Sequence, residues 1–149
     1  MSMTHIWSKT PMKICEFHIP IKNKYYVYMN KKRLLIIDDD PRNIFALVNT
    51  LRAKSYDCLS CLSADEAIEL LESDQMIDAI LLDMMMPEID GYEAIPLIKK
   101  IPSRKFTTII AVTAQAMVGD KEKCIQAGAD SYVSKPIDVD KLLAALSEI

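Results

Sequence analysis

Short apolar segments of strand length alternate with amphipathic helical segments from about residue 33 onward, and this alternation limits the possible folds more than any other feature. Each apolar segment is followed by apolar residues at helical spacing. Five β-α units in succession predict an α/β fold, a doubly wound parallel sheet with helices on both faces. The expected strands are Leu34–Ile37, Cys58–Leu62, Ile77–Leu82, Thr108–Val112 and Ser131–Ser134.

Capping residues mark where the helices begin and end. Asp40, which precedes a proline, is typical of an N-cap, and the stretch from Ser63 to Glu66 has the pattern of a capping box. Asp138 is expected to cap the last helix. A fourth helix is expected over Gln115–Ala127, closed by Gly128 in the left-handed conformation.

Polar residues follow four of the expected strands at the point where each strand ends. Asp38–Asp40 follow the first strand, Asp83 the third, Thr113 the fourth and Lys135 the fifth. The carboxyl ends of parallel strands meet at one edge of a sheet, which is where doubly wound folds bind their ligands. These side chains are therefore expected to lie together, although the N-cap role alone could explain Asp40.

This set of side chains is suited to phosphoryl transfer. Clustered carboxylates repel one another unless a cation joins them, and a hard cation such as Mg²⁺ prefers oxygen ligands. A carboxylate beside such an ion can attack phosphorus and form an acyl phosphate. The Lys135 ammonium and the Thr113 hydroxyl could then bind the remaining phosphoryl oxygens.

The motifs that carry these residues resemble the receiver domain of response regulators, the phosphoacceptor module of two-component signalling. The spacings from Asp39 to Asp83 to Thr113 to Lys135 are 44, 30 and 22 residues and match the family pattern. The resemblance covers about four-fifths of the chain and is greatest to receivers of hybrid sensor kinases. It implies a flavodoxin-like fold with strand order 2-1-3-4-5 and five helices. The matching segments are Asp38-Asp39, Asp83 to Gly91, Ile110 to Ala114 and Ser131 to Pro136.

The resemblance implies a role for each of the acidic residues. Asp83 resembles the phosphorylated aspartate of the family. Asp39 is similar to the direct ligand of Mg²⁺ or Mn²⁺, and Asp38 to the ligand that acts partly through water. Met85 is expected to offer its backbone carbonyl to the metal.

The resemblance also implies a switch. Thr113 resembles the hydroxyl that moves toward the phosphoryl group, and Tyr132 the aromatic ring that turns inward with it. Lys135 resembles the lysine that pairs with the site, and the Lys135-Pro136 peptide bond is expected to be cis.

A receiver of this kind would take its phosphoryl group from a sensor histidine kinase or a histidine phosphotransfer protein. No histidine follows His18, so residues 19–149 could not pass the group on through a histidine of their own. Output is expected through protein contacts of the fourth helix, the fifth strand and the fifth helix. The chain would be a switch rather than an enzyme with turnover, either a single-domain regulator or a receiver excised from a larger protein.

Charge and hydropathy exclude other classes of function. Residues 1–33 carry seven basic residues and one acid, which leaves 11 basic and 20 acidic residues in the remainder. An acidic body argues against direct nucleic-acid binding. No apolar run approaches the roughly 20 residues of a membrane span, so a cytoplasmic location without membrane insertion is expected.

Residues 1–30 are interpreted as an N-terminal extension, non-native or flexible, and residues 31–149 as the receiver domain; alternatively, part of the extension adds a strand or packs on a neighbour.

Three rival interpretations remain. The C-x-x-C pair Cys58 and Cys61 could bind a metal, but on a strand residues three apart point to opposite faces. Asp38-x-Asp40 could belong to a phosphohydrolase of the haloacid dehalogenase type, although the residues that follow fit that motif poorly. The chain could also be a pseudo-receiver that no longer takes phosphate, although all the acids and the lysine are present.

Overall fold

The computed structural model describes residues 31–73, 75–115 and 117–149, so the expected extension 1–30 lies outside the described residues. Residues Lys32–Ile149 form one compact unit. The helices of this described part are all too short, or too polar, to cross a membrane.

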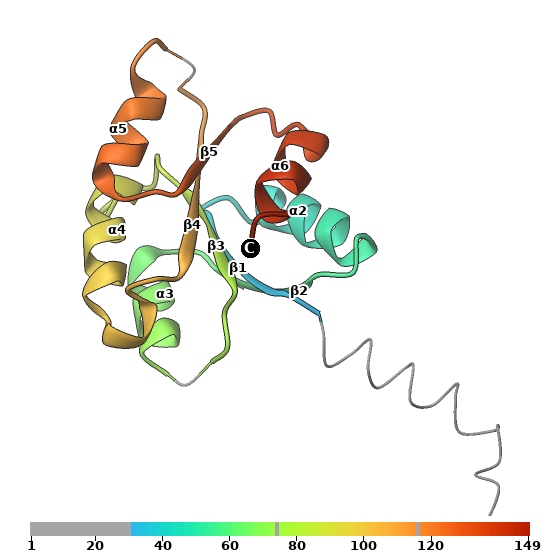
Figure 1. Ribbon diagram of the computed structural model, residues 1–149, viewed down its shortest axis with the longest axis horizontal. Helices are drawn as coiled ribbons and strands as arrows, with labels where there is room; N and C mark the ends of the chain where they lie inside the picture. Colours follow the sequence, from blue (N-terminus) through green and yellow to red (C-terminus); the bar gives the residue numbers. More distant parts are fainter. Residues whose placement is uncertain (1–30, 74, 116) are drawn as a thin grey trace, which may run out of the picture. The chain divides into compact units, whose positions relative to one another are not determined.

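A five-stranded parallel sheet forms the centre of the fold, in the order β2-β1-β3-β4-β5 (Figure 1). The predicted fold class and strand order are therefore confirmed. The order reverses at β1 and β3, which lie side by side although a β-α unit separates them in the chain. The strands are β1 (Arg33–Ile37), β2 (Asp57–Cys61), β3 (Ala79–Asp83), β4 (Thr108–Thr113) and β5 (Ser131–Ser134).

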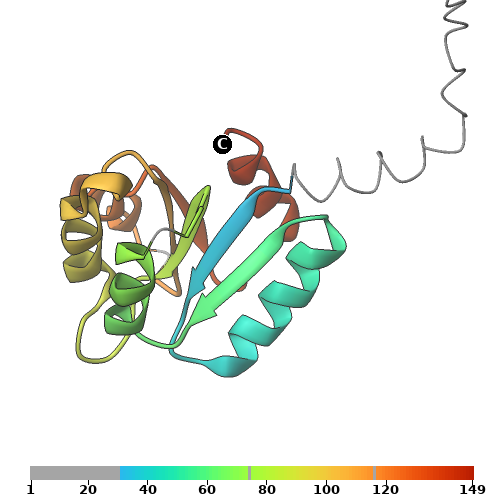
Figure 2. The ribbon, with the colours of Figure 1, turned by 90° about the horizontal axis from the view of Figure 1, so that it is seen from below.

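In the part of the chain that the structure describes, five α-helices cover the sheet, two on one face and three on the other (Figures 1 and 2). Helices α2 and α6 cover one face, and α3, α4 and α5 cover the opposite face. The helices are α2 (Pro41–Ala53), α3 (Ala64–Glu72), α4 (Gly91–Lys100), α5 (Asp120–Ala127) and α6 (Val139–Leu146), with a 3-10 turn, η2 (Pro102–Arg104), after α4.

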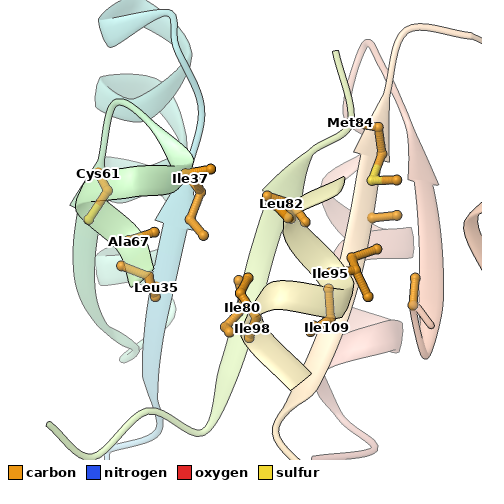
Figure 3. Close-up of a cluster of buried hydrophobic side chains, with 14 of the residues drawn as sticks. Leu35, Ile37, Cys61, Ala67, Ile80, Leu82, Met84, Ile95, Ile98 and Ile109 are labelled. Atoms are coloured by element: carbon orange, nitrogen blue, oxygen red, sulfur yellow. The ribbon is translucent and has the colours of Figure 1, made fainter. Parts of the chain in front are cut away.

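The side chains of each central strand alternate between two cores, one on each face of the sheet. Leu35 of β1 points to the side of α3 and α4, where Ile95 and Ile98 pack (Figure 3). Leu34, its neighbour in the chain, packs with the α2–α6 core. The same alternation separates Cys58 and Cys61, which belong to different cores, so this C-x-x-C cannot form a disulfide or share a metal.

The predicted caps are confirmed, but the start of the fourth helix was predicted wrongly. Asp40, Ser63 and Asp138 cap their helices through side-chain bonds to backbone N–H groups, and Gly128 ends α5 with a φ of 113°. Helix α5 begins at Asp120 rather than Gln115. Before the helix, the Gln115 N–H donates to the Thr113 hydroxyl and the Met117 N–H to the Asp120 carboxylate, and Gly119 adopts a left-handed φ of 98° that ends this irregular segment.

Candidate functional site

Three carboxylates gather at the carboxyl ends of β1 and β3, as predicted. Asp38 and Asp39 directly follow β1, and Asp83 is the last residue of β3. One oxygen from each lies within 4.8 Å of the others. Asp38 and Asp83 are 3% and 4% exposed, whereas Asp39 is exposed. A set of oxygen donors this close fits a hard divalent cation such as Mg²⁺.

Lys135 brings one positive charge to this cluster. Its Nζ lies 3.0 Å from Asp38 Oδ2 and 3.3 Å from Asp83 Oδ2, so a single ammonium serves two buried carboxylates. The lysine directly follows β5, and its N–H donates to the carbonyl of Thr113 at the end of β4. The Lys135-Pro136 bond is cis, as the resemblance implied.

Backbone groups fix the orientation of the two buried acids. The Asp40 N–H donates to Asp38 Oδ1 over 2.8 Å, and the Met85 N–H donates to Asp83 Oδ1 over 3.0 Å. Asp40 itself caps α2, and its carboxylate is paired with Arg42 at 2.9 Å. Asp40 therefore caps α2 and pairs with an arginine, and it does not belong to the cluster of Asp38, Asp39 and Asp83.

The charges of the site do not balance without a further cation. Burial raises the pKa of Asp83, and the charge of Asp38 adds to this effect, although the Met85 N–H and Lys135 oppose it. For Lys135, burial lowers the pKa, but its bonds and charge pairing with Asp38 and Asp83 outweigh this and leave the pKa raised. The site therefore favours a positive charge and disfavours the Asp83 carboxylate, which a bound cation would relieve.

This imbalance predicts a gain in stability when Asp83 is neutralised. The pKa of Asp83 is raised in the folded protein above its ordinary value of 3.8, so protonated Asp83 stabilises the fold at low pH. This stabilisation is lost as the pH rises through the raised pKa. In EDTA, we expect Asp83→Asn to have a higher Tm than the wild type at pH 7, with a difference that shrinks toward pH 4. Thermal unfolding followed by circular dichroism measures this. An equal difference at both pH values, or one matched by the exposed control Glu69→Gln, would contradict it.

Thr113 and Tyr132 are linked through Gln115. Thr113 is fully buried, and its hydroxyl oxygen accepts the Gln115 N–H over 3.1 Å. The Tyr132 hydroxyl donates to the Gln115 carbonyl over 2.8 Å. A movement of the Thr113 hydroxyl would thus alter the residue that holds Tyr132, which is the connection that the predicted switch requires.

Of the three methionines after β3, only the middle one is exposed. Met84 and Met86 are buried and pack in the core, whereas Met85 is 50% exposed beside Asp83. Its N–H binds Asp83, and the role of its carbonyl toward a metal stays a prediction.

For two residues near the site, no role was predicted from the sequence. Asn43, in the first turn of α2, places its side-chain nitrogen 3.3 Å from Asp38 Oδ2. Gly91 packs so closely on the backbone after Asp83 that a Cβ there would lie 2.6 Å from the Met84 Cα. The sequence did contain a signal for Asn43, because a helix that is capped directly after a strand places its first turn near the end of that strand. Asn43 follows Asp38 by five residues and so lies in the first turn of α2.

Comparisons with known proteins agree with this geometry. The family model described as "Response regulator receiver domain" matches residues 34–147. The polar-differentiation response regulator DivK of Brucella ovis is 32% identical over 115 residues, which cover 77% of this chain and 93% of DivK. The signal transduction histidine-protein kinase BarA of Escherichia coli K12 is 38% identical over 110 residues, 73% of this chain, but the match spans only 12% of BarA.

A solved structure is similar to this chain over most of its length. It is the receiver domain of a sensor histidine kinase from Pseudomonas aeruginosa PAO1, with a magnesium ion coordinated in its active-site cleft. It is 33% identical, with a TM-score of 0.72, and the match covers 79% of this chain and 96% of that one.

Proposed function

This chain belongs to the response regulator receiver family, whose members act in two-component signalling, and from that premise we propose that it accepts a phosphoryl group on Asp83 in a reaction that requires Mg²⁺ or Mn²⁺. The observation that supports the proposal most strongly is the meeting of three carboxylates with Lys135 at one edge of the sheet. The magnesium-bound receiver from Pseudomonas aeruginosa supports the choice of metal.

In the proposed reaction, an Asp83 oxygen attacks the phosphorus of a donor phosphohistidine. The new P–O bond forms as the P–N bond breaks, and the imidazole nitrogen keeps the electron pair. Asp38, Asp39, Asp83 and the Met85 carbonyl would hold the metal, which supplies positive charge for the phosphoryl oxygens. Lys135, 3.3 Å from Asp83, is placed to bind one of these oxygens.

The switch would follow from the new oxygens on Asp83. The Thr113 hydroxyl would donate to a phosphoryl oxygen, which changes its contact with Gln115 and so the hydrogen bond that holds Tyr132. Phosphorylation would thereby shift the balance between two conformations of the α5–β5–α6 face. Exposed apolar side chains next to this face, Met117 and Val118, support protein contact there.

The proposed donor is a sensor histidine kinase or a histidine phosphotransfer protein, which the likeness to BarA and DivK supports. The target would be a protein rather than nucleic acid, because the body of the chain is acidic. We place the protein in the cytoplasm and regard it as a switch that acts only on itself, without turnover of a free substrate.

Beryllofluoride, which mimics an aspartyl phosphate, tests the proposed site directly. We expect calorimetry to detect one equivalent bound in the presence of Mg²⁺ and none in EDTA. Asp83→Asn should abolish binding. Binding that persists in Asp83→Asn would place the acceptor elsewhere.

The exposed side chain of Met85 is expected to prolong the phosphorylated state. Being apolar and beside Asp83, it neither orients nor activates the water that hydrolyses an acyl phosphate. Met85→Asn is therefore expected to shorten the acyl-phosphate lifetime several-fold, as measured by intact mass over time after removal of the donor. Met76→Asn, at an exposed methionine in the segment before β3, is the control; an unchanged lifetime in Met85→Asn would refute the expectation.

A further inference from the structure

Asn43 approaches Asp38 without a close hydrogen bond in the present arrangement. Its Nδ2 lies 3.3 Å from Asp38 Oδ2 and 3.5 Å from Oδ1, both longer than the usual N–H···O range of 2.7–3.2 Å. The side chain is half-buried in the first turn of α2. Asn43 thus makes only long hydrogen bonds to Asp38, and a small movement would let it donate at closer range.

Asp38 depends at present on Lys135. The carboxylate is 3% exposed, and its close donors are the Asp40 N–H on Oδ1 and the Lys135 ammonium on Oδ2. Lys135 also faces Asp83, and it shares with Asn43 the lining of a groove of about 300 Å³ between α2 and the segment after β5. This open space gives both side chains room to move.

Phosphorylation of Asp83 would draw Lys135 away from Asp38. The phosphoryl group adds roughly 1.5 to 2 negative charges and three strong acceptors, and charge-assisted bonds to it are among the strongest in proteins. Asp38 Oδ2 would then lose the ammonium as its close hydrogen-bond donor while remaining buried, and a buried carboxylate oxygen that loses a donor is costly. Asn43 is the nearest other side-chain donor that the described residues place against that oxygen.

We propose that Asn43 is a positioning residue. When Asp83 carries a phosphoryl group, the Asn43 amide replaces the Lys135 ammonium as the close hydrogen-bond donor to Asp38. By donating to Asp38 Oδ2, the amide keeps this carboxylate turned toward the metal while Lys135 binds the phosphoryl oxygens. The inference rests on the proposed function. It assigns the stability of the phosphorylated state partly to a residue that touches neither the phosphoryl group nor the metal.

The test compares two ligands in the full chain, Mg²⁺ alone and beryllofluoride at saturating Mg²⁺, by isothermal titration calorimetry. Asn43→Leu removes the amide at similar size, and Asn43→Ala provides a second variant without added bulk. Asn49→Leu, at an exposed position of the same helix, is the matched control. Thermal unfolding in EDTA reports whether each variant is folded and equally stable.

Loss of a hydrogen bond to a charged group weakens binding by roughly tenfold or more, and we expect this bond to be close only when Asp83 carries the phosphoryl mimic. For both Asn43 variants we expect beryllofluoride binding to weaken roughly tenfold, with Mg²⁺ affinity alone changed less than about twofold, because the hydrogen bonds from Asn43 to Asp38 are long before phosphorylation. Asn49→Leu should behave as the wild type. Equal weakening for both ligands, or no weakening relative to Asn49→Leu, would overturn the role of Asn43. Failure of the wild type to bind beryllofluoride would instead refute the proposed function on which the inference rests.

Discussion

Replacing Arg104 with methionine is expected to lower the free energy of unfolding by about 2–3 kcal/mol, because it leaves backbone carbonyls without their donor. Arg104 is only 6% exposed, and its guanidinium donates to the carbonyls of Leu71, Ser73 and Gln75. It thereby satisfies the C-terminal end of α3 and ties the following loop to η2. The Leu71 carbonyl is buried, whereas water can reach the other two once the side chain is gone, which limits the loss.

Thermal unfolding of Arg104→Met should show a Tm lower by roughly 10 °C for a domain of this size. Arg52→Met is the matched control, since Arg52 is exposed and makes one long bond, 3.4 Å, to the Cys58 carbonyl. Arg104→Lys should recover part of the loss, because a single ammonium cannot reach all three carbonyls. Equal Tm values for Arg104→Met and Arg52→Met would show that the carbonyls do not depend on Arg104.

The sequence predicted the position of the site because the site depends on strand ends. A parallel sheet brings the residues that follow its strands to one edge, whatever the details of packing. Asp38, Asp83, Thr113 and Lys135 could therefore be placed together from the order of apolar segments alone. The switch connection through Gln115 was not predicted, since it depends on a backbone carbonyl rather than on a residue type.

Features that depend on three-dimensional packing could not be predicted in this way. From the sequence alone, Arg104 would be taken for an ordinary surface arginine. No neighbouring residue in the chain indicates that it binds carbonyls about 30 residues away. Gly91 follows an N-cap and looks like a helix start, but its close contact with the Met84 backbone appears only in the fold. The start of α5 was predicted too early in the chain, because the segment after β4 forms turns before the helix begins at Asp120.

Complete loss of phosphoryl uptake is expected in Asp83→Asn. The substitution keeps the shape of the side chain but removes the carboxylate oxygen that attacks phosphorus. It should also weaken Mg²⁺ binding, because Asp83 supplies one of the three clustered oxygens. The higher Tm expected for this variant in EDTA separates lost chemistry from lost folding. Uptake by a folded Asp83→Asn protein would mean that another residue accepts the group.

Intact mass spectrometry after incubation with acetyl phosphate and Mg²⁺ tests the central claim most directly. The account predicts one added phosphoryl group on the wild type, no addition in EDTA and none on Asp83→Asn. No addition to the wild type, together with no beryllofluoride binding in the presence of Mg²⁺, would contradict it. The chain would then be a receiver-like module that folds around its acidic site without accepting phosphate.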